Sequence, residues 1–162
     1  MTAAAPEIRA ATRDHAPAMA ALLNRIIDIG GTTGYREPFD AARIVSEFIA
    51  PARPLSCVVA LDGGRLVGFQ ALVWCDPDWP EDHRLPADWA SIATYVDPDA
   101  QGQGIGGGLM AETLRAACDA GAASIDATIR RHNAAGLAYY ARMGFEDYRA
   151  FPDAVSMRRT PA

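Results

Sequence analysis

The sequence has few cysteines, few histidines and no long apolar run, and each shortage narrows the class of protein. Its three cysteines, Cys57, Cys75 and Cys118, are far apart and form no C-x-x-C pair. We therefore expect reduced thiols in a cytoplasmic protein. The histidines fall at no spacing typical of metal ligands, so we expect no metal. No stretch approaches the ~20 apolar residues of a membrane span, and the opening "MTAAAPEIRA" lacks the pattern of a signal peptide.

Positive charge is also scarce. The chain has 15 Lys and Arg against 20 Asp and Glu, which gives a net charge of -5 at pH 7. No stripe of basic residues is present to neutralise phosphates, so we expect no nucleic-acid partner and no membrane partner. With 162 residues, half of them hydrophobic, the chain is predicted to form one domain over residues 1–162.

Strands and helices are predicted to alternate along the chain. The pattern predicts strands at 7–12, 55–61, 65–74, 90–96 and 123–129, with a final hairpin around Pro152 and Asp153. It predicts helices from Asp14 to Gly30, over 40–49, from Ile105 to Gly121 and from Asn133 to Gly144. The Pro- and Trp-rich stretch 75–89 has no periodicity and is interpreted as a loop with a function. The fold class expected is α+β, with a mixed sheet covered by helices on both faces.

A glycine-rich stretch, "YVDPDAQGQGIGGGLM" from Tyr95 to Met110, precedes the third predicted helix. A Walker A loop is excluded because no lysine follows the glycines. The sequence matches the dinucleotide-binding fingerprint G-x-G-x-x-G at Gly102, Gly104 and Gly107. Asp126 lies where an acid would meet a ribose. That interpretation is disfavoured because "DPDAQ" separates strand from glycines and too little chain follows for a doubly wound sheet.

A third interpretation uses Gln101, Gly104 and Gly106 as Q-x-x-G-x-G ahead of a helix, whose N-terminus would receive a pyrophosphate. This stretch resembles the acyl-CoA signature of the GNAT superfamily of N-acetyltransferases. Downstream, "NAAGLAYYARMGF" resembles a second segment of that superfamily, N-x-x-A-x-x-x-Y-x-x-x-G-F. The matching residues of this second segment are Asn133, Tyr140, Gly144 and Phe145, with Gly136 where alanine is common.

The resemblance implies a three-layer fold with a mostly antiparallel sheet and one splayed strand pair. It implies acetyl-CoA as cosubstrate, with main-chain groups around Val96 on the pantetheine arm and Asn133 near it. Asn133 has an alternative role as a helix N-cap. The residues expected to wrap the pyrophosphate are Gln101, Gly102, Gln103, Gly104, Ile105 and Gly106.

The resemblance also implies that Tyr140 is the general acid that protonates the coenzyme A thiolate. A phenol with a pKa of ~10 is protonated at neutral pH and can donate to a thiolate. Core packing is the alternative role for this side chain. Tyr139 is its rival, but it lies ~100° away around a helix, so we expect only one of the two to face the thioester.

A general base is also needed, because an alkyl amine is protonated at pH 7. Relatives resembling phosphinothricin acetyltransferases often have glutamate at the position of Ser91, and serine cannot serve alone. Water held by an acid or by histidine is an alternative. The candidates are Glu37, Glu81, Asp82, His83 and Asp88.

The acceptor site is expected between the loop near Tyr35 and the loop 75–89. Tyr35, Trp79 and Trp89 are candidate apolar walls, although the tryptophans could instead pin a loop or form a dimer contact. Acids would attract a cationic amine, and arginines would bind a carboxylate on it. These charged candidates are Glu37, Asp78, Asp82, Arg36 and Arg84. We therefore expect a small primary amine as acceptor; a peptide amine, or a non-catalytic acyl-CoA-binding module, is the alternative.

Overall fold

The computed structural model describes residues 5–80 and 83–162. They form one seven-stranded sheet in the order β1-β2-β3-β4-β5-β7-β6. All neighbouring strands are antiparallel except β4 and β5. The strands are β1 (Glu7–Ala10), β2 (Pro54–Asp62), β3 (Arg65–Trp74), β4 (Trp89–Val96), β5 (Ser124–Arg130), β6 (Glu146–Ala150) and β7 (Ala154–Arg159).

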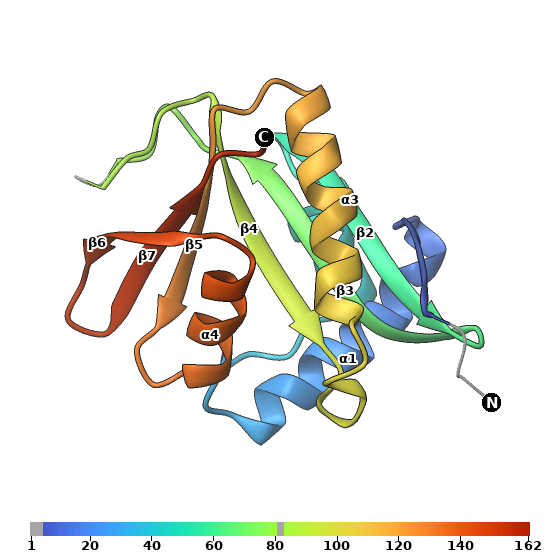
Figure 1. The fold of residues 1–162 in the computed structure, drawn as a ribbon. Coiled ribbons are helices and arrows are strands. Elements are labelled where there is room, and N and C mark those ends of the chain that lie inside the picture. Colours follow the sequence, from blue (N-terminus) through green and yellow to red (C-terminus); the bar gives the residue numbers. More distant parts are fainter. Residues whose placement is uncertain (1–4, 81–82) are drawn as a thin grey trace.

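Helices cover both faces of this sheet, as Figure 1 shows. On one face, α1 (Ala16–Ile29), α2 (Ala41–Ile44) and the π-helical turn η2 (Val45–Ile49) share a core with Val59 and Phe69. On the other, α3 (Ile105–Asp119) packs on β2, β3 and β4, and α4 (Ala134–Arg142) packs on β5. The α+β class and the three layers expected from the sequence are confirmed.

Most predicted elements are present, and the main error concerns the start of the first helix. The helix predicted to begin at Asp14 begins later, because Asp14 lies inside a 3-10 turn, η1 (Arg13–His15). Thr12 precedes that turn, and its N–H donates to His15 Nδ1 at 2.9 Å. The helix proper starts at Ala16 with proline in its first turn, where a missing N–H costs nothing.

The β2–β3 hairpin shows why its turn could be predicted. Asp62 pairs with Arg65 across two glycines, Gly63 and Gly64, whose φ angles are 58° and 84°. Both angles lie in the left-handed region that a tight two-residue turn requires and that glycine adopts without strain.

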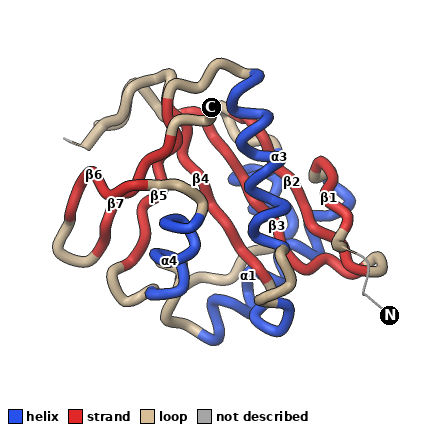
Figure 2. The backbone as a smooth tube through the Cα atoms, viewed as in Figure 1, coloured by secondary structure: helices blue, strands red, loops and turns tan. Residues whose placement is uncertain are grey.

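The parallel pair β4–β5 is splayed. It pairs only at Trp89 with Ser124, Ala90 with Ile125 and Ser91 with Asp126. Beyond these positions β4 continues to Val96 and β5 to Arg130, and Figure 2 shows the two strands diverging. The predicted splayed pair is confirmed, and it leaves one edge of β4 open.

Candidate active site

A continuous cavity of about 1600 Å³ occupies the fork between β4 and β5 and extends to the glycine-rich loop. Its walls include β4 from Ile92 to Val96, the start of α3 and residues 32–35 after α1. Every predicted cofactor residue except Gln103 lines it: Val96, Gln101, Gly102, Gly104, Ile105, Gly106 and Asn133. The open edge of β4 therefore leads directly to a helix N-terminus.

The glycine-rich loop has a conformation that other residues rarely adopt. Gly102 and Gly104 have φ angles of 82° and 78°, and Gly104 is the N-cap of α3. The N–H groups in the first turn of a helix have no acceptor within the helix, and the helix dipole makes this end positive. The loop can therefore bind an anion such as a pyrophosphate.

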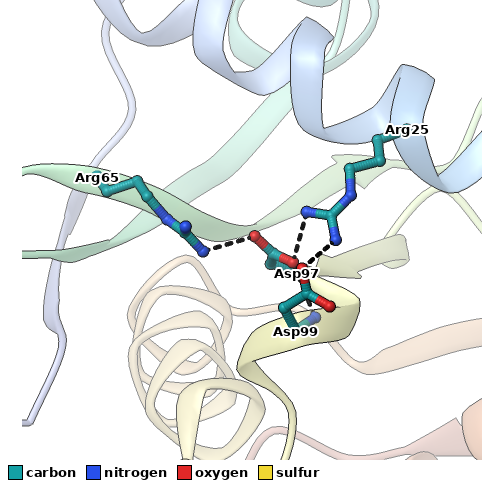
Figure 3. Close-up of polar contacts among 4 residues, drawn as sticks. All are labelled: Arg25, Arg65, Asp97 and Asp99. Carbon is teal, nitrogen blue, oxygen red and sulfur yellow. Dashed lines mark hydrogen bonds and ion pairs between the residues drawn. The ribbon is translucent and has the colours of Figure 1, made fainter.

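A cluster of ion pairs holds the start of this loop (Figure 3). Asp97 is 4% exposed and follows β4 directly. Its carboxylate accepts hydrogen bonds from Arg25 at 2.8 Å and from Arg65 at 2.9 Å. It also accepts from the N–H of Asp99 at 2.9 Å, and the Asp99 side chain pairs with Arg25 at 2.5 Å. The cluster ties α1 and β3 to the loop and fixes its position.

Gly106 has a different reason to be glycine. A Cβ atom there would lie 2.7 Å from the ring of Tyr139. The Tyr139 hydroxyl donates to the Gly106 carbonyl at 2.7 Å. This contact brings α4 against the first turn of α3, so Gly106 serves helix packing at the cavity wall.

Tyr140 is 7% exposed and lines the cavity. Its hydroxyl lies 2.7 Å from Thr94 Oγ1 on β4. Burial raises the pKa of Tyr140 above its ordinary value and raises that of Tyr139 to about 12. Both phenols are therefore protonated at neutral pH. Tyr139 also lines the cavity, and its ring centroid lies 5.0 Å from that of Tyr140.

Asn133 caps α4, since its Oδ1 accepts from the N–H of Gly136 at 2.9 Å. Its Nδ2 donates to the carbonyl of Thr32 at 3.2 Å, which ties α4 to the segment after α1. A Cβ at residue 136 would lie 2.5 Å from Asn133 Nδ2. With alanine at residue 136, the Asn133 amide would have to shift from this position.

The predicted acceptor residues are only partly brought together. Tyr35 lines the cavity, and its hydroxyl donates to Glu47 at 3.4 Å. Trp89 packs edge-on against Tyr148, with ring centroids 5.6 Å apart, and lines a separate depression. Within the described part of the chain, five other candidates are exposed or lie outside the cavity lining: Arg36, Glu37, Asp78, Trp79 and Ser91.

Of the candidate bases, His83 lines the cavity and its carbonyl accepts from Arg149 at 3.1 Å. Asp88 is exposed, and so is Arg84, which was a candidate for binding the acceptor. Glu81 and Asp82 lie outside the described residues. Within 5–80 and 83–162, no group of three His, Cys, Asp or Glu side chains could hold a metal ion, and no helix is long and apolar enough to cross a membrane.

Asp126 entered the sequence analysis only through the disfavoured dinucleotide fingerprint, and it was not expected in this cavity. It is 6% exposed on β5, and Tyr148 Oη donates to it at 2.5 Å. Thr128 Oγ1 also donates to it, at 3.2 Å. The signal was available, because "SIDATI" alternates apolar and polar residues, so Asp126 and Thr128 share one face of a strand.

The cavity joins a helix N-terminus suited to an anion with an open strand edge suited to a long extended arm. A sequence model described as the acetyltransferase (GNAT) family matches residues 19–145. The chain belongs to this family. The family predicted from the two sequence motifs is confirmed.

One curated protein and two solved structures illustrate what the chain is similar to. YwnH of Bacillus subtilis (strain 168), named for phosphinothricin acetyltransferase, is 34% identical over 68 residues, which span 42% of this chain and 42% of that protein. A GCN5-related N-acetyltransferase from Kribbella flavida has a TM-score of 0.79 at 22% identity, covering 96% of this chain and 98% of that one. A phosphinothricin acetyltransferase from Sinorhizobium meliloti in complex with AcCoA has a TM-score of 0.79 at 20% identity, covering 97% and 89%. These two structures share the fold.

Proposed function

We propose that the protein transfers an acetyl group from acetyl-CoA to a small-molecule primary amine by direct attack in a ternary complex. The observation that carries this proposal is the single cavity that joins the glycine-rich N-terminus of α3 to the fork beside Tyr140. A pyrophosphate at the helix N-terminus would extend its pantetheine arm along the open edge of β4, where main-chain groups are available as in an added strand.

In this proposal Tyr140 is the general acid. The amine nitrogen attacks the thioester carbonyl, and collapse of the tetrahedral intermediate breaks the C–S bond. A protonated phenol beside the fork can then donate its proton to the departing thiolate. Main-chain N–H groups on the unpaired edge of β4 would stabilise the oxyanion.

No covalent enzyme intermediate is required. Burial raises the pKa of Cys57 to about 12 and that of Cys75 to about 11, which makes both thiols poor nucleophiles.

A small acceptor is favoured by contacts that the loop at His83 makes at one end of the cavity. The loop at His83 is tied to β6 through Arg149, and the His83 ring lies 5.7 Å from that of Phe151. A peptide would need an open groove at this end. The relative named for phosphinothricin acetyltransferase makes amino acids and their analogues the first acceptors to try.

The test follows thiol release from acetyl-CoA across a panel of amino acids, amino-acid analogues, polyamines and short peptides. We expect release that depends on one small amine class, and coenzyme A binding in calorimetry. Release with peptides alone would overturn the small-molecule acceptor. Binding without release for any amine would indicate a non-catalytic acyl-CoA-binding module.

A further inference from the structure

Asp126 is a buried carboxylate for which the mechanism so far has no use. Its neighbours on β5, Ile125 and Ala127, pack in the apolar cluster that contains Tyr140. Side chains alternate along a strand, so Asp126 and Thr128 face the opposite side of the sheet. Burying a carboxylate among apolar strands costs free energy, and the fold offers no basic residue in an ion pair with it among the described contacts.

Hydrogen bonds hold both oxygens of this carboxylate. Tyr148 Oη donates to Oδ1 at 2.5 Å, and Thr128 Oγ1 donates to Oδ2 at 3.2 Å. Thr128 is in turn 2.7 Å from Ser156 Oγ on β7. All four side chains line the cavity. Burial raises the pKa of Asp126, while the bonds from Tyr148 and Thr128 lower it. The result is an oriented carboxylate that is a stronger base than an ordinary aspartate.

The place of Asp126 relative to the fork is equally specific. Its pairing with Ser91 is the last one between β4 and β5 before the strands part. Tyr140 approaches the fork from the α4 side through Thr94, whereas Asp126 faces it from the other side of the sheet. An acyl group in the fork would therefore have a proton donor on one side and a proton acceptor on the other.

We propose that Asp126 is the catalytic base, which binds the acceptor ammonium group and takes a proton from it. This inference rests on the proposed acetyl transfer. The neutral amine then uses its lone pair to form the C–N bond, and the C–S electron pair stays on sulfur. Tyr140 protonates that thiolate and is reprotonated by the second proton lost from nitrogen. The proton on Asp126 passes to solvent, so each turnover yields amide, free thiol and one proton.

Tyr148 is a positioning residue in this scheme. Removing its hydroxyl takes away a bond that lowers the pKa of Asp126, so the base would be protonated up to a higher pH. Several other titratable or charged groups surround Asp126 or line its part of the cavity. They are Cys75 after β3, His83 in the loop, Arg149 on β6, Arg158 opposite it on β7, and Tyr140.

The experiment measures kcat/KM for thiol release with the amine found active, from pH 6 to pH 9.5. We expect Asp126→Asn to lose about 100-fold at neutral pH, with coenzyme A affinity unchanged in calorimetry. The deficit should shrink towards pH 9.5, because more of the amine is then neutral without help. Asp147→Asn, an exposed acid on β6 that removes the same charge, should retain wild-type rates.

A second measurement follows the acid limb of the pH profile. Tyr148→Phe should move this limb to higher pH in the wild-type background and should not move it in the Asp126→Asn background. His83→Gln is included because histidine ordinarily changes charge near neutral pH. An acid limb that disappears in His83→Gln and persists in Asp126→Asn overturns the proposal.

Measurements on the wild-type enzyme distinguish failure of the proposed acetyl transfer from failure of the role proposed for Asp126. If wild type releases no thiol with any amine, the proposed acetyl transfer itself fails. If wild type is active, Asp126→Asn with wild-type rates overturns the role of Asp126 alone. A deficit of equal size at every pH also overturns it, because loss of packing or of ammonium binding would not depend on the fraction of neutral amine.

Discussion

The hydroxyl of Tyr140 lies 2.7 Å from Thr94 Oγ1, on the strand whose edge opens into the cavity. Thr94 Oγ1 also accepts from Gln70 Nε2 at 2.9 Å, and the same amide nitrogen donates to Tyr139 Oη at 3.1 Å. Because Thr94 can accept from Gln70 while donating to Tyr140, the Tyr140 proton is left available. This series of hydrogen bonds continues through Tyr139 to the carbonyl of Gly106. It links Tyr140, the proposed acid, to the glycine-rich loop.

This series of hydrogen bonds predicts different kinetic effects for substitutions of Tyr140 and Tyr139. Tyr140→Phe should lower kcat about 100-fold with little change in coenzyme A affinity, because only the donor to the thiolate is lost. Tyr139→Phe should keep most of kcat and weaken coenzyme A binding, because the tie to Gly106 is lost. Steady-state kinetics and calorimetry on both variants check this. The reverse pattern would make Tyr139 the general acid.

The left-handed conformation of Gly104 predicts a second variant. Gly104→Val should weaken coenzyme A binding at least ~10-fold, since a β-branched residue rarely adopts a φ angle of 78° and the loop would change shape. Gly64→Val is the matched control, with a φ angle of 84° and open space around it. It lies in the β2–β3 turn, so it should lower the melting temperature and leave coenzyme A affinity unchanged. Equal coenzyme A affinities for both variants would refute the glycine-rich loop as the pyrophosphate site.

The ion-pair cluster around Asp97 predicts different stabilities for two further variants. Asp97→Asn should destabilise the fold by about 1–3 kcal/mol, because a buried group with charged partners loses its charge-assisted bonds. Asp99 is 76% exposed at its side chain, so Asp99→Asn should cost less than about 1 kcal/mol. Urea unfolding of both variants measures the difference. A larger loss for Asp99→Asn would mean that the Arg25–Asp99 pair, rather than buried Asp97, holds the loop.

The local parts of this fold could be predicted because local residues decide them. Gly63 and Gly64 specify a turn by their backbone freedom, and the motif from Gln101 to Gly106 carries its conformation in its own glycines. The acceptor end depends on contacts between distant strands. Trp89 looked available as a wall, yet it packs edge-on against Tyr148, which is far away in the sequence. Asp126 was considered only as a ribose-binding acid, because its place beside the fork depends on pairing with Ser91 and on the hydroxyl of Tyr148.

The last prediction concerns stability and separates a functional carboxylate from a structural one. The folded-state pKa of Asp126 is raised above the value of 3.8 for an unperturbed aspartate, chiefly by burial. This group therefore contributes stability that is fully present below the unfolded pKa and is lost as the pH rises through the folded pKa. Asparagine cannot ionise, so Asp126→Asn avoids that loss while its amide can still meet Tyr148 and Thr128.

We therefore expect the melting temperature of Asp126→Asn, relative to wild type, to increase from pH 4 to pH 7. Asp147→Asn, at an exposed position, should show little such dependence in the same thermal-shift series. An Asp126→Asn variant that becomes relatively less stable as the pH rises would contradict the sign of the pKa shift. It would mean that the ionised carboxylate stabilises the fold and that its burial alone gives no reason to assign it to catalysis. A relative gain in stability together with a loss of activity is the combination expected of a residue placed for function.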